Sequence, residues 1–347
     1  MDVINPARHL VQRDRFGGEA DTVRPILNRS LMTHRLQRNG PSCSKVIGRA
    51  IAGSFRRSIL GTVKATCEAD VDRAQQAELA NLFLARHRGP PILLLPNVWD
   101  AWSARIFIAA GFDALATTSG GLAWALGYPD GELAPWTEVV AATARIVRSA
   151  HVPVTADIEA GYGMTPAEVG AHVAEIIQTG VVGINLEDGL HGPIRSIEDA
   201  AARLRAARDA ARKEGVPIVL NARCDIFHLQ HGEENTRFAA TVDRCKTYLG
   251  AGADCVYPFG LRDPATIAAL IKAVGGPVNI TGRPGMPDAA VFEQIGVARI
   301  TIASAPTLVA MSTIQKLAAE LRATGDFSTL TATLRHPDAQ KLFQMKG

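Results

Sequence analysis

The sequence lacks the long apolar runs and the paired cysteines that would place it in a membrane or in a disulfide-bonded fold. No window of the 347 residues approaches the roughly 18 consecutive apolar residues of a membrane span. The five cysteines are odd in number and form no CxxC pair, which argues against a disulfide framework and against a structural zinc ribbon. We therefore expect a cytoplasmic protein without a membrane partner.

Charge of one sign is also scarce outside the N-terminal region. The net charge is +3, yet residues 1–75 hold 13 Lys and Arg against 7 Asp and Glu, so the remaining chain is mildly acidic. Residues 1–72 show no sustained helical or strand period, which predicts a poorly ordered basic extension. A targeting peptide and a nucleic-acid-binding arm are the alternatives. The acids, and the lack of an apolar segment with a cleavage site, weigh against the targeting peptide. We expect no nucleic-acid partner.

Two kinds of segment alternate from about residue 73 onward. The strand-like segments are short, apolar and often β-branched, as in strands that are buried on both faces. They are expected at 92–97, 114–119, 154–159, 183–188, 218–223, 255–260, 278–282 and 299–304. The segments between them have helical spacing, and some begin with a capping residue followed by proline, as in Thr165–Pro166. They are expected at 99–110, 136–150, 166–179, 196–214, 235–250, 263–274, 287–295 and 306–324.

Eight strands and eight helices in strict alternation leave two candidate α/β architectures. Right-handed crossovers produce either an open doubly wound sheet or a closed (β/α)8 barrel. Eight repeats in about 230 residues match the usual barrel size of about 250 residues. The first strand is followed by PNVWDAW, which is not a GxGxxG phosphate loop. We therefore predict a (β/α)8 TIM-type barrel with C-terminal helices over residues 73–347.

Several predicted strands end in carboxylates, and the C-terminal strand ends carry the chemistry in such barrels. Asp157 and Glu159 end the third strand and point to one face if the chain there is extended, while Glu187 ends the fourth. Carboxylates packed so closely raise one another's pKa unless a cation lies among them. Hard oxygen ligands without a thiolate or histidine cluster favour Mg²⁺ or Mn²⁺, so these three acids are the candidate metal ligands.

Anion-binding groups are expected on the same rim. The turn Thr118–Ser119–Gly120 offers backbone N–H groups and hydroxyls, and Arg223 can grip a carboxylate with two parallel hydrogen bonds. With a Lewis-acidic metal beside them, these groups suit an α-keto acid or its enolate. Each residue alone has an ordinary structural explanation, such as a helix cap or an ion pair. As a set on one predicted rim, they favour a functional site.

The motifs DIEAGYG, NLEDG and NARCD occur in this order, preceded by LPNVWDAWSARIFIAAGFDALATTSGGLAWALGYPDGE. Over about residues 75–325 the sequence therefore resembles the isocitrate lyase/phosphoenolpyruvate mutase superfamily. The resemblance implies a Mg²⁺-dependent barrel that makes or breaks a C–C or P–C bond next to a 2-oxo acid. It implies that Asp157 is the principal metal ligand, that Glu159 is the second acid of the same motif, and that Glu187 holds metal-bound water. Asp130 would be a further active-site acid.

The same resemblance implies how substrate and subunits are held. Arg223 and the turn at 118–120 would bind the carboxylate and the oxo oxygen of the substrate. The last helices would be exchanged or packed between subunits, which predicts a homo-oligomer, either a dimer or a tetramer. The expected partner is thus a small-molecule 2-oxo acid together with further copies of the chain.

Two loops depart from the pattern of that superfamily. LEDGLHGPIRS has neither the catalytic cysteine of isocitrate and methylisocitrate lyases nor the lysines and asparagine of phosphonopyruvate-processing members. YPFGL, near the sixth strand, lacks the mutase histidine and serine. These departures argue against isocitrate lyase activity and against phosphonate mutase activity. The metal-binding and oxo-acid-binding half of the site is retained.

Histidines offer two further candidates. His191 lies in the first of these loops and is the candidate acid–base group, because histidine titrates near neutrality. A solvated loop histidine is an equally good interpretation. Cys224, His228 and His231 lie close in sequence, but no second pair of ligands accompanies them, so we expect no zinc site there.

Three functions remain open at this stage. The preferred one is a Mg²⁺-dependent lyase that cleaves a C–C bond in a small 2-oxo or 2-hydroxy dicarboxylic acid through an enolate. An oxaloacetate decarboxylase or an aldolase would perform such a reaction. The second is a P–C bond enzyme, a mutase or hydrolase, acting on phosphonopyruvate or phosphoenolpyruvate. The third is a barrel that binds a metabolite without catalysis.

Overall fold

The computed structural model describes residues 72–189 and 193–344. The chain divides into two units, Met1–Glu68 and Ala69–Gly347, and all described residues belong to the second unit. Residues 1–71 of the expected basic extension and His191 lie outside the described residues. No helix in the described ranges has the length and apolar character needed to span a membrane.

The described strands are all parallel, and their pairing arranges them in a ring. They are β1 (Leu93–Leu95), β2 (Asn97–Val98), β3 (Leu115–Thr117), β4 (Val154–Asp157), β5 (Gly183–Glu187), β6 (Val219–Cys224), β7 (Cys255–Pro258), β8 (Asn279–Thr281) and β9 (Arg299–Thr301). One run pairs in the order β2–β3–β4–β5–β6–β7 and the other in the order β1–β9–β8. Pro96 separates β1 from β2 within one stretch of chain, and a parallel bridge between Val256 and Val278 joins the two runs at β7 and β8. The expected (β/α)8 barrel is confirmed.

Helices precede the first strand, alternate with the strands and follow the last one. They are α2 (Arg73–Arg86), α3 (Ala101–Ala109), α4 (Ser119–Leu126), α5 (Trp136–Ser149), α6 (Pro166–Ile177), α7 (Ile197–Glu214), α8 (Glu234–Gly250), α9 (Pro264–Val274), α10 (Ala289–Ile295), α11 (Ala305–Thr324) and α12 (His336–Gln344). The expected cap of α6 is present, because the Thr165 hydroxyl accepts from the Glu168 N–H and the Glu168 carboxylate accepts from the Thr165 N–H. The short helix α4 was not expected, since its first turn contains Gly120 and Gly121.

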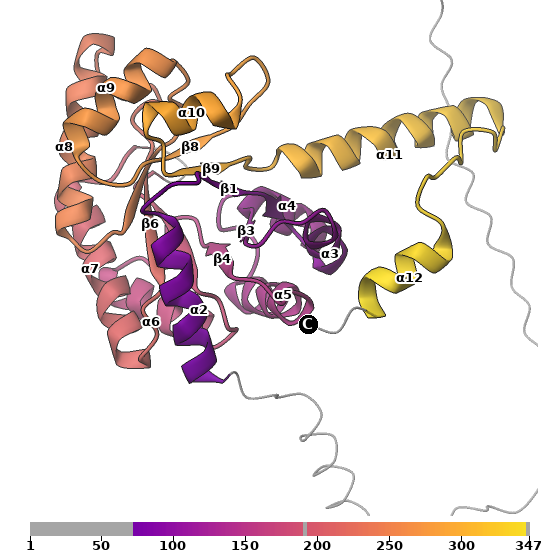
Figure 1. Ribbon diagram of the computed structural model, residues 1–347, viewed down its shortest axis with the longest axis horizontal. Helices are drawn as coiled ribbons and strands as arrows, with labels where there is room; N and C mark the ends of the chain where they lie inside the picture. Colours follow the sequence, from indigo (N-terminus) through magenta and orange to yellow (C-terminus); the bar gives the residue numbers. More distant parts are fainter. Residues whose placement is uncertain (1–71, 190–192, 345–347) are drawn as a thin grey trace, which may run out of the picture. The chain divides into compact units, whose positions relative to one another are not determined.

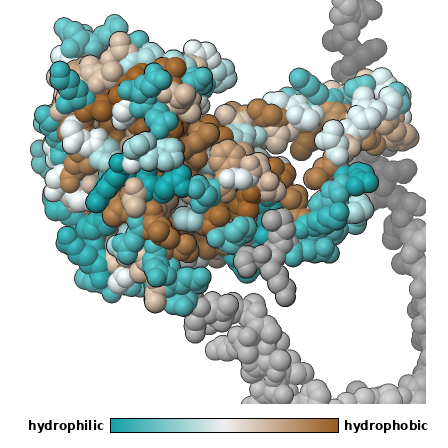
Figure 2. Space-filling view, in the orientation of Figure 1, coloured by the Kyte–Doolittle hydropathy of each residue, from teal (hydrophilic) through white to brown (hydrophobic). Residues whose placement is uncertain are grey.

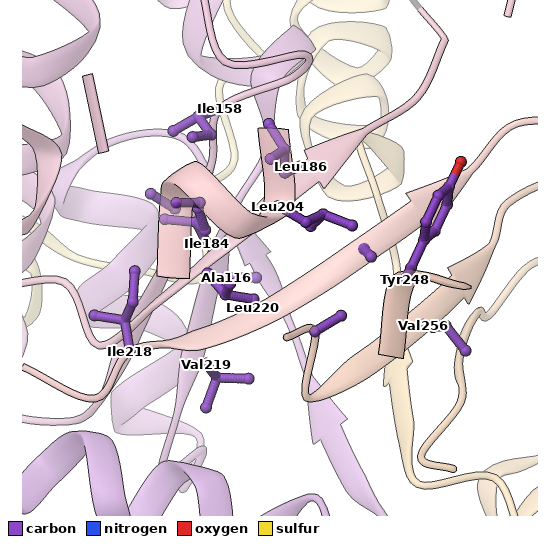
Figure 3. Close-up of a cluster of buried hydrophobic side chains, with 14 of the residues drawn as sticks. Ala116, Ile158, Ile184, Leu186, Leu204, Ile218, Val219, Leu220, Tyr248 and Val256 are labelled. Atoms are coloured by element: carbon purple, nitrogen blue, oxygen red, sulfur yellow. The ribbon is translucent and has the colours of Figure 1, made fainter. Parts of the chain in front are cut away.

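The main core lies between the ring and the helices. Figure 3 shows Ile184, Leu186 and Leu220 on the strands with Leu204 of α7 beside them, all of them buried. Each such aliphatic side chain contributes about 1.5–3 kcal/mol when fully removed from water. This packing fixes the backbone positions at the strand ends, where the polar side chains of the site begin.

The helix α11 extends away from the barrel, and α12 follows beyond it (Figure 1). Of its 20 residues only Thr307 is buried. Its apolar side chains are instead exposed, and Figure 2 shows apolar surface along this helix and on the adjoining part of the barrel near α3. Apolar side chains are therefore exposed both on α11 and on the barrel surface near α3.

Candidate active site

A cavity of about 210 Å³ runs from the C-terminal rim into the barrel. Its walls are mostly polar, and they come from nearly every strand of the ring. The lining residues are Asn97, Ala116, Thr117, Thr118, Ser119, Asp130, Thr155, Ala156, Asp157, Asn185, Arg223, His228, Tyr257, Phe259, Asn279, Arg299, Thr301, Ala303 and Ser304. The structure thus brings together the predicted residues Thr118, Ser119, Asp130, Asp157 and Arg223 in one small volume.

One wall of the cavity is the beginning of α4. Thr118 is the N-cap of this helix, but its side chain makes no capping hydrogen bond and pairs with the Ser304 hydroxyl at 2.9 Å instead. The first N–H groups of α4 are therefore not capped by that side chain. A helix N-terminus of this kind favours an anion, because its N–H groups and its dipole both attract negative charge. This wall can hold the carboxylate of a small acid.

Gly120 permits the close approach of Asp130 to this turn. A Cβ at position 120 would lie 3.0 Å from an Asp130 carboxylate oxygen and 3.1 Å from the Ser304 hydroxyl oxygen. Desolvation raises the pKa of Asp130, and the neighbouring Asp157 raises it further. The protonation of Asp130 therefore depends on the charges around it in the cavity.

Asp157 ends β4 and stands inside the cavity. From the described residues, its oxygens accept only long hydrogen bonds, from the Asn185 side-chain amide at 3.3 Å, the Glu159 N–H at 3.3 Å and the Ser119 N–H at 3.4 Å. Hydrogen bonds of this length are weak, so the carboxylate keeps lone pairs for a stronger ligand. Asp157 is the best placed of the three predicted metal-binding acids.

Glu159 does not face the cavity, and the sequence argument for its direction was wrong. The strand ends at Asp157, and Glu159 has a φ of 51°, so the alternation of an extended strand no longer applies. Both of its carboxylate oxygens accept from the Glu132 N–H at 3.0 Å, and one accepts from the Tyr162 hydroxyl at 3.1 Å. Burial raises the pKa of Glu159 to about 8 against the opposing hydrogen bond, and Asp130 and Asp157 add to the rise.

Glu187 is also outside the cavity lining and is paired with an arginine. The Arg223 guanidinium contacts Glu187 at 2.6 Å and Asp225 at 2.7 Å. Burial raises the pKa of Glu187 well above its usual value, although Arg223 opposes the shift. Burial lowers the pKa of Arg223, but the two carboxylates outweigh it and leave that pKa above its ordinary value. Arg223 is thus a permanent cation in the cavity wall, shared between protein carboxylates and any bound acid.

The acids fit a divalent cation that keeps much of its water. Within residues 72–189 and 193–344, no group of three or more His, Cys, Asp or Glu side chains could hold a metal ion directly. A direct shell made of Asp157, Glu159 and Glu187 is therefore not assembled. Mg²⁺ commonly binds through one or two carboxylates, with water and substrate oxygens as the other ligands. Asp157 and Asp130 line the cavity and match this hard-oxygen chemistry.

The sequence analysis considered His228 only as a zinc ligand and did not single out Phe259, yet both residues line the opposite wall of the cavity. The His228 ring lies 4.7 Å from the Phe259 ring, and the Arg223 guanidinium carbon lies 4.0 Å above the Phe259 ring centre. Burial lowers the pKa of His228, and Arg223 and Arg283 lower it further, so its imidazole is neutral near pH 7. The available signal was position, since His228 follows Arg223 by five residues in the turn after β6. Cys224, which was considered with His228 as a zinc ligand, is buried beside Cys245 instead of facing the cavity.

Comparisons with known proteins show which proteins the chain is similar to. Residues 83–322 match the family described as phosphoenolpyruvate phosphomutase. The chain is 41% identical to a crystal structure described as a "putative phosphonomutase" from Burkholderia cenocepacia, with a TM-score of 0.67, covering 70% of this chain and 99% of the other. It is 29% identical to the "Probable 2-methylisocitrate lyase 1" of Corynebacterium glutamicum, over 74% of this chain and 84% of the relative. It is 27% identical to the oxaloacetate decarboxylase of Pseudomonas aeruginosa, over 65% and 79% respectively.

Proposed function

Because the chain belongs to the phosphoenolpyruvate phosphomutase family, within the isocitrate lyase/phosphoenolpyruvate mutase superfamily of C–C lyases and mutases, we propose that it cleaves a C–C bond in a small 2-oxo or 2-hydroxy dicarboxylic acid. The observation that carries the proposal is the small cavity in which the N-terminus of α4, Asp157 and Arg223 converge. At about 210 Å³ it is smaller than the usual drug-sized pocket of ~300–1,000 Å³, which suits a substrate of few carbon atoms. Decarboxylation of oxaloacetate is the preferred form of the reaction.

The residues of the chain divide the work between binding and proton transfer. The first N–H groups of α4 and the Ser119 side chain hold the carboxylate next to the oxo group. Arg223 supplies fixed positive charge from the opposite wall. A divalent cation at Asp157, Mg²⁺ or Mn²⁺, would supply Lewis acidity toward the oxo oxygen and the enolate. Glu159 and Glu187 would act on its bound water rather than on the ion itself.

The experiment that tests the proposal is pyruvate release from oxaloacetate in buffer with Mg²⁺ and with EDTA. Buffer with Mg²⁺ but without protein gives the background of spontaneous decarboxylation. We expect protein-dependent release that EDTA removes, and a rate with phosphonopyruvate or methylisocitrate at least about 100-fold lower. Turnover of oxaloacetate that is insensitive to EDTA would contradict the role of the metal.

The second candidate function is P–C bond chemistry on phosphonopyruvate. The identity of 41% to the Burkholderia phosphonomutase-like structure supports it. The loop at 189–195 opposes it, because no lysine or asparagine is available there to bind a phosphonate. Preferential turnover of phosphonopyruvate in the same substrate panel would establish this alternative. Calorimetric binding of an oxo acid with no turnover in any assay would establish the third, a barrel that binds without catalysis.

We propose that His228, which lines the cavity, takes part in proton transfer. The acid–base role expected for His191 stays a prediction, since that residue lies outside the described residues. In a 2-hydroxy acid, the neutral imidazole would accept the hydroxyl proton as the C–C bond breaks. In oxaloacetate, loss of CO2 leaves an enolate that must gain a proton, and the neutral imidazole would orient the water that supplies it. Replacing His228 with glutamine is expected to lower kcat by about 100-fold or more. Because the pKa of His228 lies below 6.5, the acid limb of the wild-type pH–rate profile should fall below that pH and should be absent from the variant. The exposed His231→Gln variant is the matched control and should keep both the rate and the profile.

We also propose that the protein is a homo-oligomer in which a second copy covers the apolar surface of α11. Leu308, Val309, Met311 and Ile314 of this helix are exposed to between 48% and 67%. A groove of about 560 Å³ beside them is lined by Trp99, Trp102, Ile106, Phe107, Pro306 and Val309, among others. Exposed apolar surface of this kind marks a protein–protein interface. In the proposed oligomer, α11 of one chain packs into the groove of another chain.

The double variant Val309→Asp/Ile314→Asp is therefore expected to be monomeric. Each aliphatic side chain contributes about 1.5–3 kcal/mol when buried, and a carboxylate in its place is costly to desolvate. Sedimentation velocity should show a dimer or tetramer for the wild type and a monomer for the variant. The neighbouring exposed Gln315→Asp variant controls for added charge and should leave the assembly unchanged. A wild-type protein that sediments as a monomer would refute this proposal.

A further inference from the structure

A buried arginine lines the inner end of the catalytic cavity and has no assigned role. Arg299 is the first residue of β9 and is 2% exposed. Its Nε and Nη1 atoms are buried and have no hydrogen-bond partner within the described residues. Register places it opposite Asn279, two residues before the Thr301 level, which is about 7 Å along the strand toward the N-terminal end of the barrel. It therefore lies deeper in the cavity than the rim groups.

The groups that face Arg299 are almost all neutral. Burial and the charge of Arg299 lower the pKa of His87 to about 3, so this imidazole is uncharged. Burial raises the pKa of the Cys255 thiol to about 12 and raises that of the Tyr257 hydroxyl, so neither is an anion at pH 7. Asp157 is the one carboxylate within electrostatic reach, and in the described part of the chain it makes no salt bridge with Arg299.

The side chains around Arg299 are polar but carry no compensating charge. Asn279 pairs with Arg299 in the register of β8 and β9, Thr301 follows two residues later on the same strand as Arg299, and both line the cavity. A guanidinium stays protonated in proteins, and a buried charge is destabilising unless it is paired. Water can accept hydrogen bonds from these N–H groups, but only an anion also balances their charge.

We propose that Arg299, with the side chain of Asn279 beside it, forms an internal binding site for a small inorganic anion such as chloride. The site is separate from the substrate carboxylate site at α4, and it does not depend on the reaction proposed above. The anion would neutralise the guanidinium and fix the polar floor of the cavity beneath Asp157.

Bromide is the probe for this site, because it replaces chloride and scatters anomalously. Crystals of the full chain grown in sodium bromide should show an anomalous peak at the Arg299 guanidinium. In solution, the melting temperature should rise with bromide concentration and saturate, relative to sodium gluconate at equal ionic strength. In Arg299→Met the half-saturating bromide concentration should rise by at least about tenfold, since the fixed charge is gone.

Two further variants keep the test decisive if Arg299→Met fails to fold. Asn279→Asp keeps the side-chain shape and places a permanent carboxylate beside Arg299, so its melting temperature should no longer respond to bromide. Asn81→Asp, on an exposed position of α2, adds the same charge elsewhere and should retain the wild-type response. Equal melting temperatures in bromide and gluconate, with water alone at Arg299, would overturn the proposal. A bromide peak that persists when oxalate is bound supports a separate site, whereas its displacement by oxalate would assign Arg299 to the substrate.

Discussion

Replacing Asp157 with asparagine is expected to lower kcat/KM by about 10³-fold or more while leaving the protein folded. The Asp157 carboxylate lines the cavity and keeps lone pairs for a ligand, because its hydrogen bonds from Asn185, Glu159 and Ser119 are all 3.3 Å or longer. An amide keeps the shape of the side chain but cannot provide the negative charge that a divalent cation needs. The loss should therefore appear in catalysis and in metal affinity.

The free energy of unfolding of Asp157→Asn in the absence of metal should equal or exceed that of the wild type. The charge of Asp157 raises the pKa of Asp130 and of Glu187, so its removal relieves repulsion among the remaining acids. Thermal unfolding with and without Mg²⁺ measures this directly, and the shift produced by Mg²⁺ should disappear in Asp157→Asn. Asp209→Asn, on the exposed side of α7, is the matched control. Metal-dependent turnover that survives in Asp157→Asn would remove Asp157 from the metal site.

The barrel was predictable because its signal repeats. Eight apolar segments alternate with eight segments of helical spacing, and only closed or doubly wound sheets accommodate such a run of crossovers. Boundaries were less predictable, since strand and helix ends depend on local contacts. The extended segment expected at 154–159 ends at Asp157, where the backbone turns and Glu159 enters the left-handed region with a φ of 51°. Hydrogen bonds from the Glu132 N–H and the Tyr162 hydroxyl to Glu159 fix that turn. Glu132 is distant in the sequence, and no sequence pattern marks the contact with Tyr162.

The site was predictable on one wall and not on the other. Asp157, Arg223 and the turn at 118–120 follow strands directly, so the rule that strand ends meet at one rim identifies them. His228 and Phe259 come from the turn after β6 and from just after β7, and their meeting depends on how those two segments fold over the rim. Arg299 was overlooked because it begins a strand, where polar residues were not sought. Alternation of polar residues along β8 and β9, at Asn279 and Thr281 and at Arg299 and Thr301, was the signal that marks a polar interior.

Replacing Arg223 with methionine is expected to cost both activity and stability. The guanidinium holds Glu187 at 2.6 Å and Asp225 at 2.7 Å, and the two carboxylate side chains are only 8% and 2% exposed. Removing one partner of a buried ion pair costs about 3–5 kcal/mol, because the remaining charge stays buried without compensation. For a domain of this size that corresponds to a fall in melting temperature of about 10 °C. The substrate also loses its fixed cation, so kcat/KM should fall by about 10³-fold.

The pH dependence separates these two losses. Without Arg223 the folded-state pKa values of Glu187 and Asp225 rise further above their unfolded values. A carboxyl whose folded pKa is raised contributes stability below its unfolded pKa and loses it as pH rises through the folded pKa. The stability deficit of Arg223→Met should therefore be small near pH 5 and large near pH 8, as measured by thermal unfolding across that range. The double variant Arg223→Met/Glu187→Gln removes one of the stranded charges and should recover part of the melting temperature but none of the activity. A deficit that is equal at both pH values would show that Arg223 stabilises the barrel through packing instead of through its charge.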